Sequence, residues 1–93
     1  MRATRVFIVF AKDEKPSLSK FAIEGVTKKV DLMDHETGLR ESISRMLHYD
    51  LVVTCGQWHE DERCNQLIDI ARKSDMKIIH ESRFKYYVKT YND

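Results

Sequence analysis

The apolar positions along the chain fall into short runs typical of strands and into spaced patterns typical of helices. Residues 5–10 and 50–55 are largely continuous β-branched and aromatic runs, the pattern of strands buried on both faces of a parallel sheet. Residues 76–79 form a shorter apolar run. Residues 28–33 alternate between charged and apolar side chains, which suits a half-exposed edge strand. The pattern therefore predicts four strands.

Three other segments space their apolar residues three and four positions apart, which predicts amphipathic helices. The first covers residues 36–48, the second covers residues 60–74, and the third follows Ser82, whose side chain can cap it. The apolar stripes comprise Leu39, Ile43, Met46 and Leu47 in the first helix, Cys64, Leu67, Ile68 and Ala71 in the second, and Phe84, Val88 and Tyr91 in the third.

The segment before the edge strand admits two interpretations. In the first, Ser17 caps a short helix that ends at Gly25, and one face of that helix carries Leu18, Phe21 and Ala22. In the second, residues 21–23 pair with residues 30–32 as a hairpin that turns at Gly25. The first interpretation keeps the alternation of strands and helices.

This alternation predicts one α/β domain over residues 1–93. We expect a three-layer α/β sandwich with a short, mostly parallel four-stranded sheet in the order 2-1-3-4, and helices on both faces. The strands around residues 6–10 and 51–54 should be adjacent, parallel and central. The loop after residue 55 then leaves a central strand at the carboxyl edge of the sheet, where open α/β folds bind ligands.

Composition narrows the function only slightly. The chain is 42% hydrophobic and 33% charged, as in an ordinary soluble globule, and its net charge of +1 argues against a general affinity for nucleic acid. The apolar run of residues 6–11 is too short to span a membrane or to act as a signal peptide. Two cysteines make no disulfide framework, so we expect a cytoplasmic protein with free thiols.

One stretch of the second half resembles a known family. Residues 47–58, followed by Cys64-Asn65-Gln66-Leu67 and Ala71, are similar to the nucleoside 2-deoxyribosyltransferase-like proteins, especially their small relatives. The resemblance covers about a third of the chain. It implies a Rossmann-like fold with a nucleoside pocket beside the Gly56-Gln57-Trp58 loop.

The departures from the family pattern argue against its chemistry. The family's nucleophilic glutamate falls on Leu67, and a transglycosylase of this type needs a carboxylate against the anomeric carbon. The loop at residues 11–16 also lacks the family's Gly-Pro turn. If any catalysis remains, Asp61 or Glu62 would have to supply the relocated carboxylate. We therefore lean against an enzyme and expect a ligand-binding or regulatory module.

The expected pocket lies between the loop after the first strand and the loop after residue 55. Trp58 can stack on a ring or can plug the end of the core. Acidic residues at 60–62 suit a helix N-terminus, but they would repel a phosphate, so a neutral or cationic ring is the expected ligand. The predicted ligand-binding residues are Ala11, Lys12, Ser17, Gly56, Gln57, Trp58 and His59.

Other chemistries have weaker sequence support. Cys55, His59 and Cys64 have metal-ligand residue types, but a fourth zinc ligand would have to be the distant His35, His48 or His80, so we expect no metal and no cofactor. A Cys55 nucleophile paired with His59 lacks an orienting group. The last helix is rich in tyrosine, a residue enriched at interfaces. The alternative to a ligand-binding module is therefore an interaction adaptor or a homodimer, using Phe84, Tyr87 and Tyr91.

Overall fold

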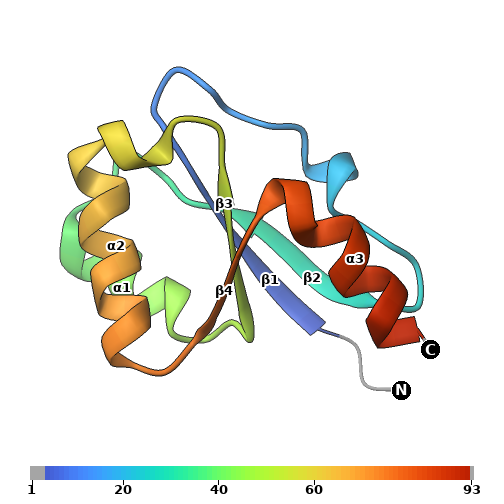
Figure 1. Ribbon diagram of the computed structural model, residues 1–93. Coiled ribbons are helices and arrows are strands. Elements are labelled where there is room, and N and C mark those ends of the chain that lie inside the picture. The colour runs from blue at the N-terminus through green and yellow to red at the C-terminus, as the bar shows by residue number, and fades with distance from the viewer. Residues whose placement is uncertain (1–3, 93) are drawn as a thin grey trace.

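A four-stranded parallel sheet forms the centre of the molecule (Figure 1). The computed structural model describes the backbone of residues 4–92 and the side chains of residues 4–87. The strands are β1 (Thr4–Phe10), β2 (Thr27–Leu32), β3 (Leu51–Cys55) and β4 (Lys77–His80), and they lie in the order β2-β1-β3-β4. The predicted order is confirmed, and so are the adjacent, parallel and central positions of β1 and β3.

The two central strands are almost wholly buried, as their continuous apolar runs require. Residues 6–10 of β1 and residues 51–55 of β3 have at most 4% of their surface exposed. Their register places Val9 opposite Thr54 and Phe10 opposite Cys55, so both strands end at the same level of the sheet. The loops after Phe10 and Cys55 therefore leave the sheet side by side.

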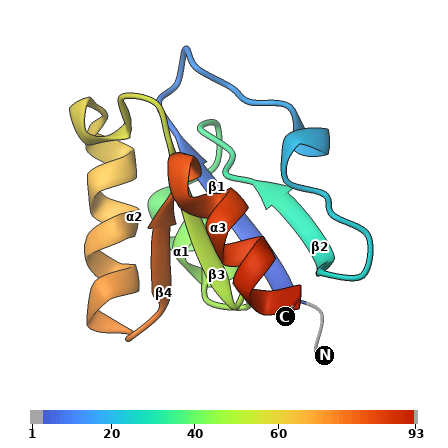
Figure 2. The same cartoon turned by 45° about the vertical axis from the view of Figure 1, so that its right-hand side comes forward.

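Helices cover both faces of the sheet, which confirms the three-layer prediction (Figure 2). Helices α1 (Leu39–Met46) and α2 (Glu62–Lys73) cover one face, and α3 (Glu81–Asn92) covers the other. The connections through α1 and α2 cross the sheet in the same direction, whereas the β1–β2 connection crosses in the opposite direction. Right-handed crossovers then put the β1–β2 connection on the α3 face.

The β1–β2 connection differs from both sequence interpretations. The expected helix is only a 3₁₀ turn at Leu18–Lys20, and the hairpin is wrong because residues 21–23 form no strand. Phe21 explains the difference: its ring is buried and packs edge-on against Phe84 of α3, with ring centroids 5.2 Å apart. The Ser17 hydroxyl bonds to the Ser19 hydroxyl instead of capping a helix.

The helix ends also differ from the predicted boundaries. Helix α1 stops at Met46, so Leu47 leaves the apolar stripe and is 47% exposed. Helix α3 begins directly after β4, and the Ser82 hydroxyl bonds to Nδ1 of His80 rather than acting as a cap. The stripe of α2, by contrast, is confirmed because all four of its members are buried: Cys64, Leu67, Ile68 and Ala71.

Candidate functional site at the carboxyl edge

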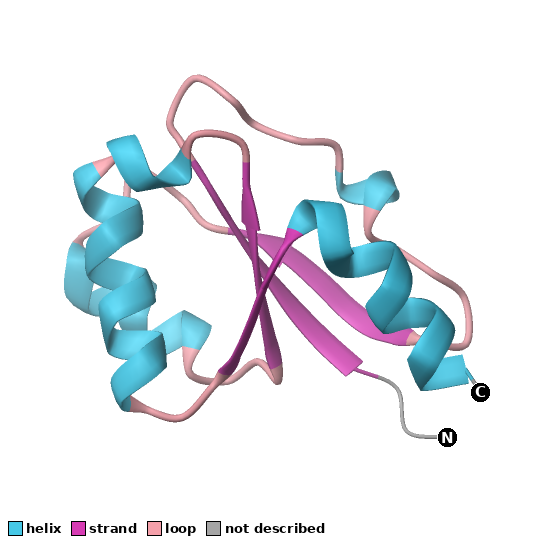
Figure 3. Cartoon of the chain, viewed as in Figure 1, coloured by secondary structure: helices cyan, strands magenta, loops and turns pink. Residues whose placement is uncertain are grey.

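The loops after β1 and β3 meet at the carboxyl edge of the sheet, where the connections diverge to opposite faces (Figure 3). The first loop runs from Ala11 to Ser17, and the second passes through a 3₁₀ turn at Trp58–Glu60 to the start of α2. Direct hydrogen bonds join the two loops. This is the topological switch point that the sequence predicted as the binding region.

Asp61 joins the first loop to α2. Its side chain caps the helix by accepting a hydrogen bond from the Cys64 amide at 3.1 Å, and it also accepts one from the Lys12 amide at 3.1 Å. Burial by itself would raise the pKa of Asp61, but these two amides and the nearby His35 outweigh it and hold the pKa below its ordinary value. Asp61 is therefore an ionised structural acceptor at neutral pH.

Two further carboxylates accept hydrogen bonds from backbone amides at the end of β3. Glu14 accepts a hydrogen bond from the Gln57 amide at 3.0 Å, and Glu81 accepts one from the Gly56 amide at 2.7 Å. The left-handed φ of +54° favours glycine at position 56, and a Cβ atom there would lie 2.6 Å from Oε2 of Glu14, so the Glu14 side chain would have to move. The protein's own carboxylates thus fill the positions where backbone amides could receive an anion.

Two hollows flank the end of β1. The smaller, of about 270 Å³, lies between the two loops and is lined by Ala11, Lys12, Asp13, Glu14, Gln57, Glu60 and Asp61. The larger, of about 590 Å³, lies over the ends of β1 and β2, and its lining includes Phe10, Lys12, His35 and Arg45. Lys12 contributes to both hollows.

The structure brings together only part of the predicted ligand-binding set. Ala11, Lys12 and Gln57 line the smaller hollow, and Gly56 lies next to Glu14, which also lines it. The lining of the two hollows does not include the other predicted residues, Ser17, Trp58 and His59.

The position of Trp58 agrees with the second of its two expected roles, a plug at the end of the core. Its half-buried side chain packs against the hydrophobic core, and the exposed His59 ring lies edge-on to it with centroids 6.1 Å apart. Of the two candidate carboxylates, Asp61 lines the smaller hollow, whereas Glu62 is exposed in the first turn of α2. The geometry therefore favours Trp58 as a plug at the end of the core.

A polar network in the larger hollow was missed by the sequence analysis. Asp31 accepts hydrogen bonds from the Arg45 guanidinium at 2.5 Å and from the Tyr49 hydroxyl at 2.8 Å. Burial would raise the pKa of Asp31, but Arg45 and Tyr49 reverse this effect and lower it. In the sequence, the charged positions of β2 are typical of solvent-facing side chains. Only the contact with Arg45 of α1 shows that Asp31 is paired.

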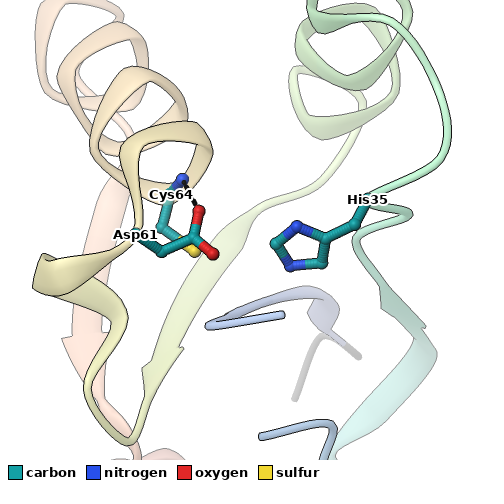
Figure 4. A group of neighbouring side chains, drawn as sticks. All are labelled: His35, Asp61 and Cys64. Atoms are coloured by element: carbon teal, nitrogen blue, oxygen red, sulfur yellow. Dashed lines mark hydrogen bonds between the residues drawn. The ribbon is translucent and has the colours of Figure 1, made fainter. Parts of the chain in front are cut away.

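A second missed feature is the group formed by His35, Asp61 and Cys64 (Figure 4). One ligand-type atom from each residue lies within 4.8 Å of the others. His35 Nε2 and Cys64 Sγ both donate to the Phe10 carbonyl, at 2.7 and 3.1 Å. The sequence pattern suggested Asp61 as a catalytic acid rather than a metal ligand. The possible metal ligands in the sequence pattern combined Cys64 with Cys55 and His59.

The buried groups offer little nucleophilic chemistry. Leu67 is fully buried. Burial and the negative charge of Glu81 raise the pKa of the Cys55 thiol to about 12. Burial and the negative charge of Asp61 raise the pKa of the Cys64 thiol to about 12. Both thiols are therefore protonated at neutral pH, and a Cys55–His59 nucleophile has no support.

The fold buries part of the predicted dimer surface on α3. Phe84 is 6% exposed and belongs to the core of its own chain, and half-buried Tyr87 packs against that core. The side chain of Tyr91 lies outside the described residues. Tyr86, which is 72% exposed, is the large apolar side chain that α3 presents to solvent among residues 81–87.

Comparison with family models, curated proteins and solved structures finds no match to this chain. Within residues 4–92, no helix has the length and apolar character needed to cross a membrane. What is shown is an α/β fold with a polar, acidic crevice at the switch point of its sheet.

Proposed function

We propose that this protein is a non-catalytic module that binds a small neutral or cationic ring compound, such as a nucleoside, at the carboxyl edge of its sheet. The observation that carries the proposal is the set of carboxylates around the two loops. Glu14 and Glu81 accept hydrogen bonds from the backbone amides of the second loop, and other acids line the space between the loops.

The charge of the smaller hollow selects against phosphorylated ligands. Its lining has four acids (Asp13, Glu14, Glu60 and Asp61) and one lysine, which gives four negative charges minus one positive charge, or −3. Two like charges about 4 Å apart repel by about 4 kcal/mol at the effective dielectric of a protein surface. A phosphate would meet several such charges, whereas a cation would be attracted and a neutral ring would be indifferent.

The size of the site suits a nucleoside-sized molecule. The larger hollow falls within the roughly 300–1,000 Å³ typical of small-molecule sites. Its lining offers both signs of charge, with three cations (Lys12, Lys15 and Arg45) and three acids (Asp31, Asp34 and Glu36). A ring compound lying across both hollows would contact Lys12 at the point that they share.

The roles that the acids already have support a non-catalytic module. Asp61 and Glu14 are held as acceptors by backbone amides, and Leu67 stands where the related chemistry needs a carboxylate. The two buried free cysteines support a reducing cytoplasmic setting.

Ligand-detected NMR with three matched sets of compounds tests the proposal. The sets are uncharged nucleosides, cationic ring compounds of similar size, and the 5′-monophosphates of the same nucleosides. We expect at least one member of the first two sets to bind, and the matching monophosphate to bind at least tenfold more weakly. No free base should appear during the incubation.

Two variants test the electrostatic argument. Glu60→Gln removes one charge from the smaller hollow and should weaken the binding of a cation, whereas Asp69→Asn removes an exposed charge elsewhere on α2 and should not. Tighter binding of the monophosphates than of the nucleosides would contradict the proposal. Turnover abolished by Asp61→Asn would replace it with an enzyme.

A further inference from the structure

We infer that His35, Asp61 and Cys64 form a binding site for one divalent transition metal ion of the zinc type. The site goes beyond the proposed ligand-binding function and does not depend on it. The three residues come from two parts of the chain that the fold brings together: His35 follows β2, whereas Asp61 and Cys64 begin α2 (Figure 4). Imidazole, carboxylate and thiolate are the three side-chain ligands that zinc uses.

The separations are close to those of a metal site. The three ligand atoms lie within 4.8 Å of one another. Zinc bonds of about 2.0–2.3 Å place tetrahedral ligands about 3.4 Å apart, so the ligand atoms have to approach one another by up to about 1.4 Å. Figure 4 shows the His35 ring directed toward the other two side chains from the opposite loop.

The present hydrogen bonds hold the three side chains in one place, and the Cys64 thiol gives up its bond to the Phe10 carbonyl when it loses its proton to bind the metal. His35 and Cys64 both point at the Phe10 carbonyl, which accepts from each of them. Asp61 accepts one amide hydrogen bond on each oxygen, and an ionised carboxylate has about four lone-pair positions. Each ligand group is therefore already oriented toward the end of β1.

Charge also favours a divalent ion. On binding, the Cys64 thiol releases its proton to solvent and its sulfur forms a bond to the metal, while His35 binds through a neutral ring nitrogen. One thiolate and one carboxylate then balance the two positive charges, giving a neutral site. The N-terminus of α2 carries a partial positive charge that would repel a bare cation, and the two negative ligands compensate for this repulsion. Three protein ligands leave a fourth position for water, as in open zinc sites.

The pairs of cysteines and histidines in this chain supply matched controls. Cys55 is buried like Cys64 but does not belong to the group, and His59 is an exposed histidine outside it. The experiment is a titration of the reduced full-length protein with Co²⁺, without any organic ligand, followed by displacement with Zn²⁺. A thiolate bound to Co²⁺ gives a charge-transfer band in the near ultraviolet.

We expect one equivalent of Co²⁺ to produce this band, and Zn²⁺ to remove it. Cys64→Ser should abolish the band, and His35→Gln should weaken Co²⁺ binding by at least about tenfold. Cys55→Ser and His59→Gln should bind like the wild type. If Cys64→Ser fails to fold in the absence of metal, the comparison of His35→Gln with His59→Gln decides the question.

The inference is overturned if stoichiometric Co²⁺ gives no thiolate band, or if the members of each matched pair bind Co²⁺ equally. Because no organic ligand is present, these outcomes are independent of the small-molecule proposal.

Discussion

Glu81 offers a sharp test of the idea that internal carboxylates organise the carboxyl edge. One of its oxygens accepts the Gly56 amide at 2.7 Å, and the other pairs with the Lys20 ammonium. The Glu81 side chain is 21% exposed, whereas that of Lys20 is 55% exposed. The perturbation is Glu81→Ala, which removes both interactions at the start of α3.

The two interactions contribute unequally. A hydrogen bond to a charged group contributes about 1.5–3 kcal/mol, because its loss leaves a partly buried amide without its acceptor. An ion pair with an exposed lysine contributes about 0.2–1 kcal/mol. We therefore expect Glu81→Ala to lower the free energy of unfolding by about 2–3 kcal/mol. In a domain of this size each kcal/mol lowers Tm by about 4–8 °C, so the loss should be of order 10–20 °C.

Urea unfolding followed by circular dichroism measures this effect, with Lys20→Ala as the control that removes the ion pair and the lysine's contact with the Phe21 ring but keeps the Glu81–Gly56 hydrogen bond. Lys20→Ala should cost less than about 1 kcal/mol. Glu81→Gln keeps an acceptor for the Gly56 amide and should fall between the two. Equal losses in Lys20→Ala and Glu81→Ala would refute the reasoning, because the ion pair would then carry the whole effect.

Three further predictions concern the core, the loop and pH. Leu67→Glu should destabilise the protein by several kcal/mol, measured by urea unfolding, because it buries a carboxylate at a fully buried position, whereas Leu67→Met should be tolerated. Trp58→Ala should lower the free energy of unfolding by about 1–3 kcal/mol, judged from its half-buried packing, and should leave ligand affinity unchanged; the reverse pattern would return Trp58 to a stacking role. The folded state holds the pKa values of Asp31, Asp61 and Glu81 below their ordinary values, so these groups stabilise the fold above pH values of about 4, and this contribution should be lost as the pH falls through the lowered pKa values. A Tm that stays constant from pH 6 to about pH 3 would contradict the last prediction.

Periodicity predicted the elements that obey a single local rule. The runs at 5–10 and 50–55 are apolar on both faces, so they had to be central strands, and the stripe from Cys64 to Ala71 had to face the sheet. The prediction from periodicity was wrong where a tertiary contact overrides the local preference. Phe21 packs on Phe84, far away in the chain, and this contact leaves a 3₁₀ turn where the local pattern suggested a helix.

The candidate site shows the same division. The sequence by itself determined the fold class, the strand order and the edge at which to look, because burial pattern and crossover handedness depend on short-range spacing and chain direction. It did not determine which side chains meet there. Lys12 and Asp61 are 49 residues apart, and Gly56 and Glu81 are 25 apart, yet both pairs share a hydrogen bond. Only the tertiary structure could place Asp61 beside His35 and Cys64, because polar side chains on loops carry no periodicity and their partners are chosen by how the strand ends converge.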